Sequence, residues 1–95
     1  MTQRCIIDKS SVPRWARGVL FRHDEARDRW MIVGPERILV PQGTGVDISH
    51  LIDGERDVDA IADKLGDEYD ADRELIIEET IAFLQQLADR RYLDL

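Results

Sequence analysis

The side chains that could perform chemistry are mostly carboxylates, and they stand where helices would place them in solvent. Glu78 and Glu79 fall within one expected helix, and Asp57 and Asp59 stand at the start of another. Two carboxylates act as general acid and base only when their surroundings separate their pKa values. Nothing in the pattern marks either pair as buried. The sequence therefore predicts no catalytic residue, and we expect a protein that is not an enzyme.

Metal ligands and nucleophiles are sparse in this sequence. The chain has one cysteine, Cys5, and two histidines, His23 and His50, which are too dispersed to suggest a metal cluster. It contains no Ser-His-Asp pattern, no phosphate-binding loop and no Cys-x-x-Cys pair. We expect neither a bound metal nor a cofactor.

Composition and charge narrow the class of protein. The 95 residues suit a single domain with a modest core, and 43% hydrophobic with 35% charged residues is typical of a globular chain. The net charge of −7 is uneven. Residues 1–50 carry eight basic and six acidic side chains, whereas residues 51–95 carry five and fourteen. This balance disfavours a polyanionic partner such as nucleic acid.

The sequence also predicts a cytoplasmic protein with no membrane partner. No apolar run approaches the ~18 residues that a spanning helix needs. The first residues lack the apolar core and cleavage site of a signal peptide, and a lone cysteine cannot form an internal disulfide.

The first half of the chain predicts strands. After a flexible lead-in over residues 1–13, β-branched and aromatic residues concentrate in three runs, which are residues 17–22, 30–33 and 37–40. Polar residues and a Gly-Pro pair separate the runs as turns. We expect a three-stranded antiparallel meander whose last strand offers an unpaired edge.

The stretch 44–65 has the outline of a helix-turn-helix. Thr44 with Asp47 three residues later resembles a capping box, and an Asp53-Gly54 turn separates the two short helices. Such a framework commonly reads DNA, but residues 55–79 carry eleven acidic and only three basic side chains. Its shape therefore favours DNA binding, whereas its charge disfavours it.

A second helix, capped by Asp57, would end at Gly66, and a third would start after Asp70 or Asp72 and extend to about Arg91. The predicted fold class is α+β and winged-helix-like, with a three-stranded antiparallel sheet followed by three helices. A single domain over residues 14–95 is expected to contain all of them.

The last helix has an unusually broad apolar face. Its apolar residues cover an arc of about 160°, wider than the ~100° stripe of a typical surface helix. They are Ile76, Ile77, Ile81, Phe83, Leu84, Leu87 and Ala88. Either the helix is wrapped deeply into the core, or one flank forms the wall of an apolar groove that a partner fills.

Three functions are compatible with these elements. A winged-helix DNA binder is opposed by the charge. A structural module could form a homodimer by pairing the free strand edges of two copies. A peptide binder suits the physics better, because a free edge beside a broad apolar helix can accept an added strand and its side chains.

The order of several short motifs resembles the PqqD family, the pyrroloquinoline quinone (PQQ) synthesis protein D family. The resemblance covers about residues 13–95, although Pro41-Gln42 replaces the Leu-Asn type of pair usual there. In chain order the motifs are Arg17-Gly18, Gly34-Pro35-Glu36, Ile52-Asp53-Gly54, Asp57-Val58-x-x-Ile61 with Leu65, and Leu87 with Tyr92-Leu93.

This resemblance implies a non-catalytic peptide chaperone of the type called a RiPP recognition element. Such a protein binds the ribosomally made precursor peptide PqqA and presents it to the radical SAM enzyme PqqE. The leader peptide would add a strand between the third strand and the long helix. In this chain the implied peptide-binding residues are Arg37, Ile38, Leu39 and Val40 on the strand, and Ile76, Ile77, Glu79 and Phe83 on the helix.

Overall fold

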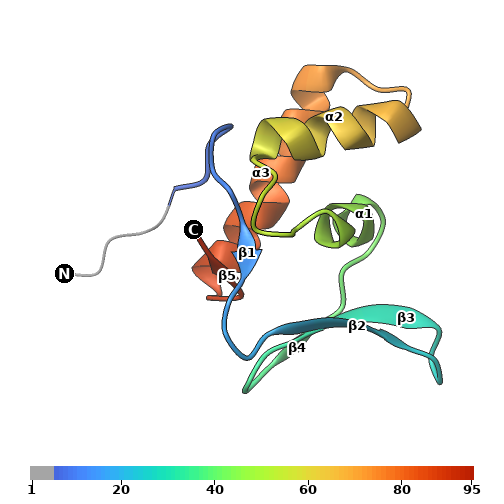
Figure 1. Ribbon diagram of the computed structural model, residues 1–95. Coiled ribbons are helices and arrows are strands. Elements are labelled where there is room, and N and C mark those ends of the chain that lie inside the picture. Colours follow the sequence, from blue (N-terminus) through green and yellow to red (C-terminus); the bar gives the residue numbers. More distant parts are fainter. Residues whose placement is uncertain (1–5) are drawn as a thin grey trace.

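The computed structural model describes residues 6–95. Figure 1 shows a three-stranded sheet on one side, with the helices and a smaller sheet packed above it. The elements in chain order are β1 (Arg14–Trp15), β2 (Leu20–Asp24), β3 (Arg29–Val33), β4 (Ile38–Leu39), α1 (Thr44–His50), α2 (Val58–Glu68), α3 (Arg73–Asp89) and β5 (Leu93–Asp94). The predicted α+β class, with a three-stranded antiparallel sheet before three helices, is confirmed.

The larger sheet has the order β2-β3-β4, and both of its ladders are antiparallel. In the central strand β3, Val33 lies opposite Leu20 of β2 on one side and Ile38 of β4 on the other. Strand β2 begins three residues later than the sequence predicted, because Gly18 has a φ of 84° and turns the chain before Leu20.

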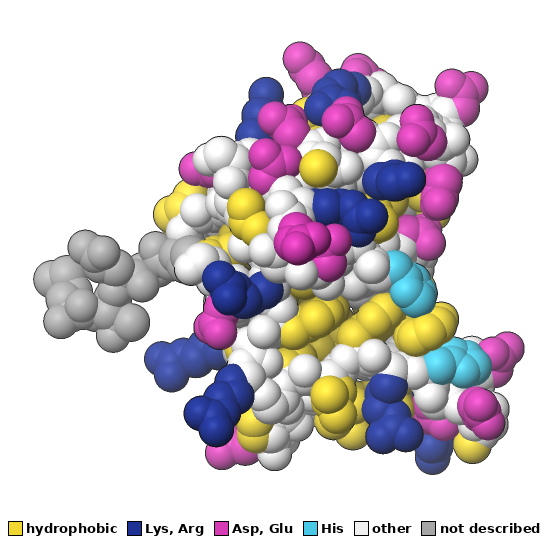
Figure 2. Space-filling model, viewed as in Figure 1, with side chains coloured by type: hydrophobic (Ala, Val, Ile, Leu, Met, Phe, Trp, Pro, Cys, Tyr) yellow, Lys and Arg dark blue, Asp and Glu magenta, His cyan; other side chains and the backbone are white. Residues whose placement is uncertain are grey.

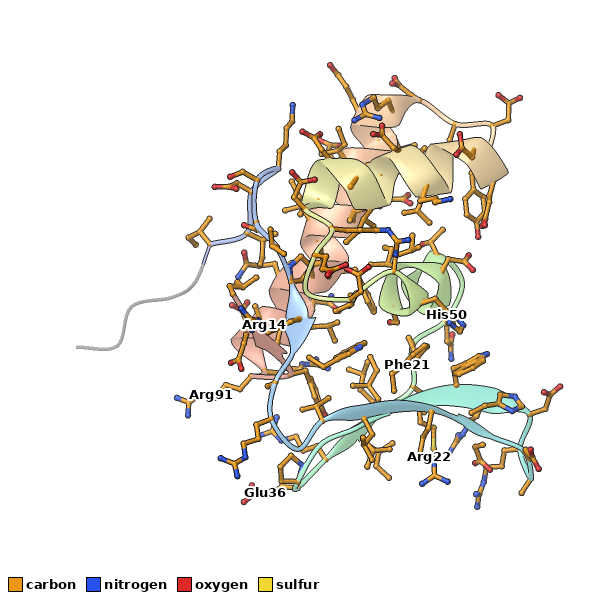
Figure 3. All side chains as sticks on the ribbon, in the orientation of Figure 1. Arg14, Phe21, Arg22, Glu36, His50 and Arg91 are labelled. Carbon is orange, nitrogen blue, oxygen red and sulfur yellow. The ribbon has the colours of Figure 1, made fainter. Side chains whose placement is uncertain are left out.

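The inner face of this sheet packs against α1 through aromatic rings. The ring of Phe21 stacks on Trp30 at 4.9 Å and on Trp15 at 5.8 Å between centroids. The His50 imidazole and the Trp30 ring form a T-shaped pair with their centroids 4.4 Å apart. Side chains alternate between the faces of a strand, so Figure 3 shows Phe21 directed toward α1 and Arg22 directed away from it.

Helices α2 and α3 form the rest of the core and begin at capping aspartates. The Asp57 carboxylate accepts a hydrogen bond from the Ala60 N–H at 2.8 Å, and the Asp72 carboxylate accepts one from the Glu74 N–H at 3.1 Å. Each cap satisfies an N–H group that has no partner within its helix. The prediction of Asp57 as a cap is confirmed, and Asp72 rather than Asp70 starts α3.

Helix α1 begins at Thr44 as predicted, but the predicted capping box there and the predicted end of α2 at Gly66 are wrong. The Thr44–Asp47 capping box does not form, because α1 is preceded by Gly43 with a φ of 57° and has no side-chain cap. Gly66 does not end α2, since it keeps a helical backbone and the helix continues until Tyr69 turns extended. None of the helices in residues 6–95 has the length and apolar character needed to cross a membrane.

A second, two-stranded sheet was not predicted. Strands β1 and β5 pair antiparallel, with Arg14 opposite Asp94 and Trp15 opposite Leu93. Each strand has two residues, so no local pattern signals it. Only the folding of the chain as a whole brings these two segments together.

Residues ahead of β1 contact the body of the domain. Ile7 is buried in the core, and its N–H donates to the Gln85 side chain at 2.9 Å. The carbonyl oxygens of Ser11 and Lys9 accept hydrogen bonds from the first N–H groups of α2, at 3.0 and 3.2 Å. The flexible segment over residues 1–13 stays a prediction, and Cys5 lies outside the described residues.

Candidate peptide-binding site

Strand β4 is an edge of the larger sheet, and Ile38 offers its backbone to an incoming strand. The Gly34 N–H donates to the Arg37 carbonyl oxygen at 2.8 Å, which closes the β3–β4 turn. Hydrogen-bonded and non-hydrogen-bonded pairs alternate along an antiparallel ladder. The next pair, Val33 and Ile38, is therefore non-hydrogen-bonded, and the N–H and C=O of Ile38 point away from β3.

The four predicted strand residues present different groups along this edge. The Ile38 side chain is 60% exposed on the outer face of the sheet, in a row with Val33 and Leu20. Leu39 packs against the core from the inner face, and Val40 is half-buried. The exposed Arg37 precedes the strand and lines a cavity.

The four predicted helix residues are divided between two surroundings. Ile76 and Glu79 line one small pocket with α1. Phe83 also faces α1, because a Cβ atom on Gly45 would lie only 2.8 Å from its ring. Ile77 belongs to the core and does not line that pocket. Of the two flanks of α3, the structure places the one with Ile76 and Phe83 beside α1.

We call the first cavity the helix pocket, which has a volume of about 100 Å³. Its apolar walls come from α1, α2 and α3 and include Ile48, Leu65, Leu75 and Ile76. Tyr69 stands at its rim, where its hydroxyl donates to the Asp47 carboxylate. That hydrogen bond raises the pKa of Tyr69 above its ordinary value. The pocket has room for one small apolar side chain.

The second cavity is larger and basic. It lies between the β3–β4 turn and the end of α3, has a volume of about 520 Å³, and we call it the arginine cavity after four of its lining residues. They are Arg17, Arg37, Arg90 and Arg91. Two carboxylates, Glu36 and Asp89, also line it, but the four arginines outnumber them and the lining keeps a net positive charge. Figure 2 shows dark-blue side chains at the lower left, on this side of the molecule, and many acidic ones over the helices.

Close packing holds the walls of the arginine cavity in place. A Cβ atom on Gly34 would lie 2.9 Å from the Tyr92 ring, so the turn presses directly against the chain that follows α3. Tyr92 is itself buried, and its carbonyl oxygen accepts a hydrogen bond from the Ala16 N–H at 3.0 Å. Three separate segments of the chain therefore meet at this cavity.

Arg91 adopts a backbone conformation that glycine normally supplies. Its φ is 65°, in the left-handed region, and α3 ends two residues before it, at Asp89, instead of extending to Arg91 as the sequence predicted. The Tyr92 N–H donates to the Leu87 carbonyl and the Arg91 N–H to the Ala88 carbonyl, which is a Schellman motif. A residue with a Cβ atom pays roughly 1–2 kcal/mol for this conformation.

The arginine at the other end of α3 is paired internally. The Arg73 guanidinium donates to the Asp63 carboxylate and, at 3.3 Å, to the Asp59 carboxylate. The hydrogen bond to Asp63, followed by the nearby negative charges, raises the pKa of Arg73 further above its ordinary range. These contacts join the start of α3 to the exposed face of α2.

The described residues offer little for catalysis or metal binding. Within residues 6–95 no group of three or more His, Cys, Asp or Glu side chains could hold a metal ion. Among the same residues His23 lies 3.1 Å from the Asp28 carboxylate, in an exposed turn. The arrangement as a whole is suited to binding.

Sequence reasoning missed the residues at the end of α3. It placed Arg90 and Arg91 in the last turn of a helix, where cations offset the dipole, and left Arg17 open between a basic patch and a solvated sheet face. One signal could have indicated a binding role for them. Two arginines stand where a helix often ends in glycine, and they lie in the strongly acidic half of the chain.

Known proteins share this sequence and this architecture. The family description Coenzyme PQQ synthesis protein D (PqqD) matches residues 29–93. A PqqA binding protein of Rhodopseudomonas palustris (strain BisB5) is 44% identical over 87 residues, which are 92% of this chain and 85% of the relative.

Two solved structures are also similar. One is the solution structure of the PqqD truncation of Methylobacterium extorquens PqqCD, a functional and stand-alone RiPP recognition element. It superimposes with a TM-score of 0.80 at 37% identity and covers 94% of this chain and 95% of that one. TbiB1 in complex with the TbiA(beta) leader peptide has a TM-score of 0.74 over 85% of this chain and 94% of that one. At 20% identity this second likeness shows the fold alone.

Proposed function

Because the chain belongs to the PqqD family of coenzyme PQQ synthesis proteins, we propose that it binds the precursor peptide PqqA during PQQ biosynthesis. The peptide adds a strand at the edge of β4, and α3 forms the second wall of the site. The name of the relatives, PqqA binding protein, supports the choice of peptide. The outward-directed N–H and C=O of Ile38 are the observation that supports strand addition.

On the helix side we propose that Ile76, Glu79 and Phe83 face the peptide. Ile76 and Glu79 line the helix pocket, which takes one apolar side chain of the peptide, and Phe83 lies in the next turns of the same flank. Ile77 remains the weakest of the predicted site residues, because it does not line the helix pocket, whereas Ile76, which is equally buried, does.

The protein acts in this proposal by presentation and not by catalysis. A peptide held as an added strand has already lost much of its conformational freedom, so a modifying enzyme meets it at a lower entropic cost. The radical SAM enzyme PqqE is the proposed recipient. A cytoplasmic location, expected from the sequence, goes with this role.

The two other functions make different demands on the same surfaces. A homodimer would use the β4 edge for a second copy and leave it closed to the peptide. DNA binding would require the helix-turn-helix to meet phosphates, although residues 51–95 carry five basic and fourteen acidic side chains.

A titration of the full chain with synthetic PqqA, followed by amide NMR, tests the proposal. We expect the largest shifts in residues 36–41 and 74–84. Shifts confined to residues before β1, or no shifts at all, would rule out the site. Sedimentation at several protein concentrations reports whether a homodimer competes for the edge, and repetition with PqqE reports a ternary complex.

A pair of variants at Ile38 isolates the backbone contribution. Ile38→Pro removes the N–H that points away from β3, which an edge strand tolerates, and should weaken PqqA binding at least tenfold. Ile38→Ala keeps that N–H and should retain most of the affinity. Leu39→Pro is a poorer test, because its N–H points into the β3–β4 ladder. Equal binding by folded Ile38→Pro and Ile38→Ala variants would contradict strand addition.

A further inference from the structure

We infer that the arginine cavity is a carboxylate subsite, which receives an aspartate or glutamate side chain of the peptide bound at β4. The inference rests on the proposed peptide binding and names the chemistry that recognises one part of the peptide. The cavity joins Arg37, directly before β4, to Arg90 and Arg91 at the end of α3. A strand that pairs with Ile38 and continues past Arg37 therefore reaches it.

The guanidinium groups of this cavity are available to a ligand. Among residues 6–95 none of the four arginines lies within 4.0 Å of a carboxylate oxygen. Asp89, on the same wall, already accepts a hydrogen bond from the Gln85 amide at 2.9 Å. A guanidinium presents two parallel N–H donors to a carboxylate, so each open fork suits an acidic side chain.

The backbone at Arg91 gives independent support. With a φ of 65°, this position closes the Schellman motif of α3 and would be served at lower energy by glycine. An outlier of this kind that lines a cavity points to a role for its side chain in binding. Figure 3 shows the Arg91 side chain on the same side of the molecule as Glu36, at the tip of the β3–β4 turn.

The shape and the surrounding charge favour a single carboxylate over a long polyanion. Neighbouring residues of a strand are about 3.3 Å apart, so the acidic residue should lie within a few residues of the one paired with Ile38. A nucleic acid strand leaving the cavity would meet the acidic helical half of a chain with a net charge of −7. A peptide with one acidic side chain at this register avoids that repulsion.

Calorimetric titration of the full chain with synthetic PqqA peptides tests the subsite. In a peptide series, each Asp or Glu is replaced in turn by Asn or Gln. One replacement should weaken binding about tenfold, and Arg91→Gly should weaken binding of the unmodified peptide by a similar factor. The two losses should not add when this variant meets that peptide, because both remove the same interaction.

Arg91→Gly also separates binding from folding. Glycine accepts the φ of 65°, so the melting temperature should stay the same or rise while affinity falls. Arg22→Gln is the matched control, because Arg22 is exposed on the outer sheet face, away from the cavity (Figure 3), and its loss should leave affinity unchanged.

Each outcome of this experiment decides something. Equal binding of every amide peptide, or unchanged binding by Arg91→Gly, overturns the subsite while the peptide-binding function stands. Failure of the unmodified chain to bind unmodified PqqA overturns both. Tighter binding of a duplex oligonucleotide than of PqqA, lost in Arg91→Gly, would assign the arginines to nucleic acid and overturn the carboxylate subsite.

Discussion

Helix α3 begins and ends among arginines, but its two ends use them differently. At the first residue, Arg73 donates to Asp59 and Asp63 of α2, so its charge is matched within the domain. At the far end, Arg90 and Arg91 line the arginine cavity and form no ion pair with a described residue. The first end is joined to α2 by ion pairs, and the second lines a cavity.

The arginine at the start of α3 therefore belongs to the fold, whereas the two at its end remain available to a ligand. A surface ion pair between two helices contributes little to stability. Its arginine, however, already uses its N–H donors within the protein and cannot offer them to a ligand. An arginine on a strained backbone that forms no ion pair with a described residue can still donate these hydrogen bonds to a ligand. Substitutions at the first end should therefore change stability, and substitutions at the far end should change affinity.

The largest expected effect comes from the middle of α3, which both ends share. Leu84 is fully buried, and Leu84→Ala should lower the free energy of unfolding by about 2–5 kcal/mol. The free energy of unfolding of a native domain is only about 5–15 kcal/mol in total, so urea unfolding will detect the change easily. Leu75→Ala, at a 48% exposed position, is the control with a much smaller loss. A loss below 1 kcal/mol in Leu84→Ala would mean that the two ends are not held by one core.

The next effect tests the close approach of α1 to α3. Gly45→Ala places a methyl group 2.8 Å from the Phe83 ring and should cost about 1–3 kcal/mol in stability, with a loss of PqqA affinity as Phe83 shifts. Gly66→Ala in α2 is a matched control of opposite sign. Its Cβ would meet only Ile76 at 4.0 Å, so better helix propensity should raise the melting temperature. Two changes of the same sign would contradict this description of the packing.

A smaller effect is expected at the start of α3. Arg73→Gln removes the pairs to Asp59 and Asp63 and should lower the melting temperature slightly, by an amount that shrinks as salt is added. PqqA affinity should not change, in contrast to Arg91→Gly. If both arginine variants lost affinity equally, the distinction between the two ends would be gone.

The smallest effect concerns acid, at a turn remote from both ends. The backbone N–H groups of Arg56 and then Glu55 hold the pKa of Asp53 below its ordinary value of 3.8. Its folded pKa is lowered, so its contribution to stability is present above about pH 3.8 and disappears as the pH falls through the lower folded value. Thermal melts from pH 5 downward should therefore show a slightly weaker acid dependence in Asp53→Asn than in the unmodified chain, with neutral-pH affinity for PqqA unchanged.

Local signals in the sequence were sufficient for much of the fold. A carboxylate before an apolar periodic run places the cap at Asp57 correctly and narrows the cap of α3 to Asp70 or Asp72, because capping depends on residues two or three positions away. The turn signals likewise place the three strands of the larger sheet. Glycine was misleading as a stop signal, since Gly66 can remain helical.

The candidate site depended on contacts that no local pattern encodes. The broad apolar arc of α3 suggested two flanks, but only the packing of Phe83 against Gly45 places one of them beside α1. The direction of the Ile38 backbone follows from the register of β4, which a shift of one residue would reverse. The arginine cavity joins segments up to about 70 positions apart in the chain, from Arg17 to Arg91.

The pairing of β1 with β5 has a consequence for how this domain can be joined to others. Arg14 lies opposite Asp94, and the Ile7 N–H donates to Gln85 in the last part of α3, so the first and last described residues lie on the same side of the domain, as Figure 1 shows. A tether on either end would hold the domain by that one side and leave its orientation toward a linked enzyme nearly the same. Fusions in either order are therefore geometrically interchangeable, provided that residues 7–13, which complete the first turn of α2, are kept.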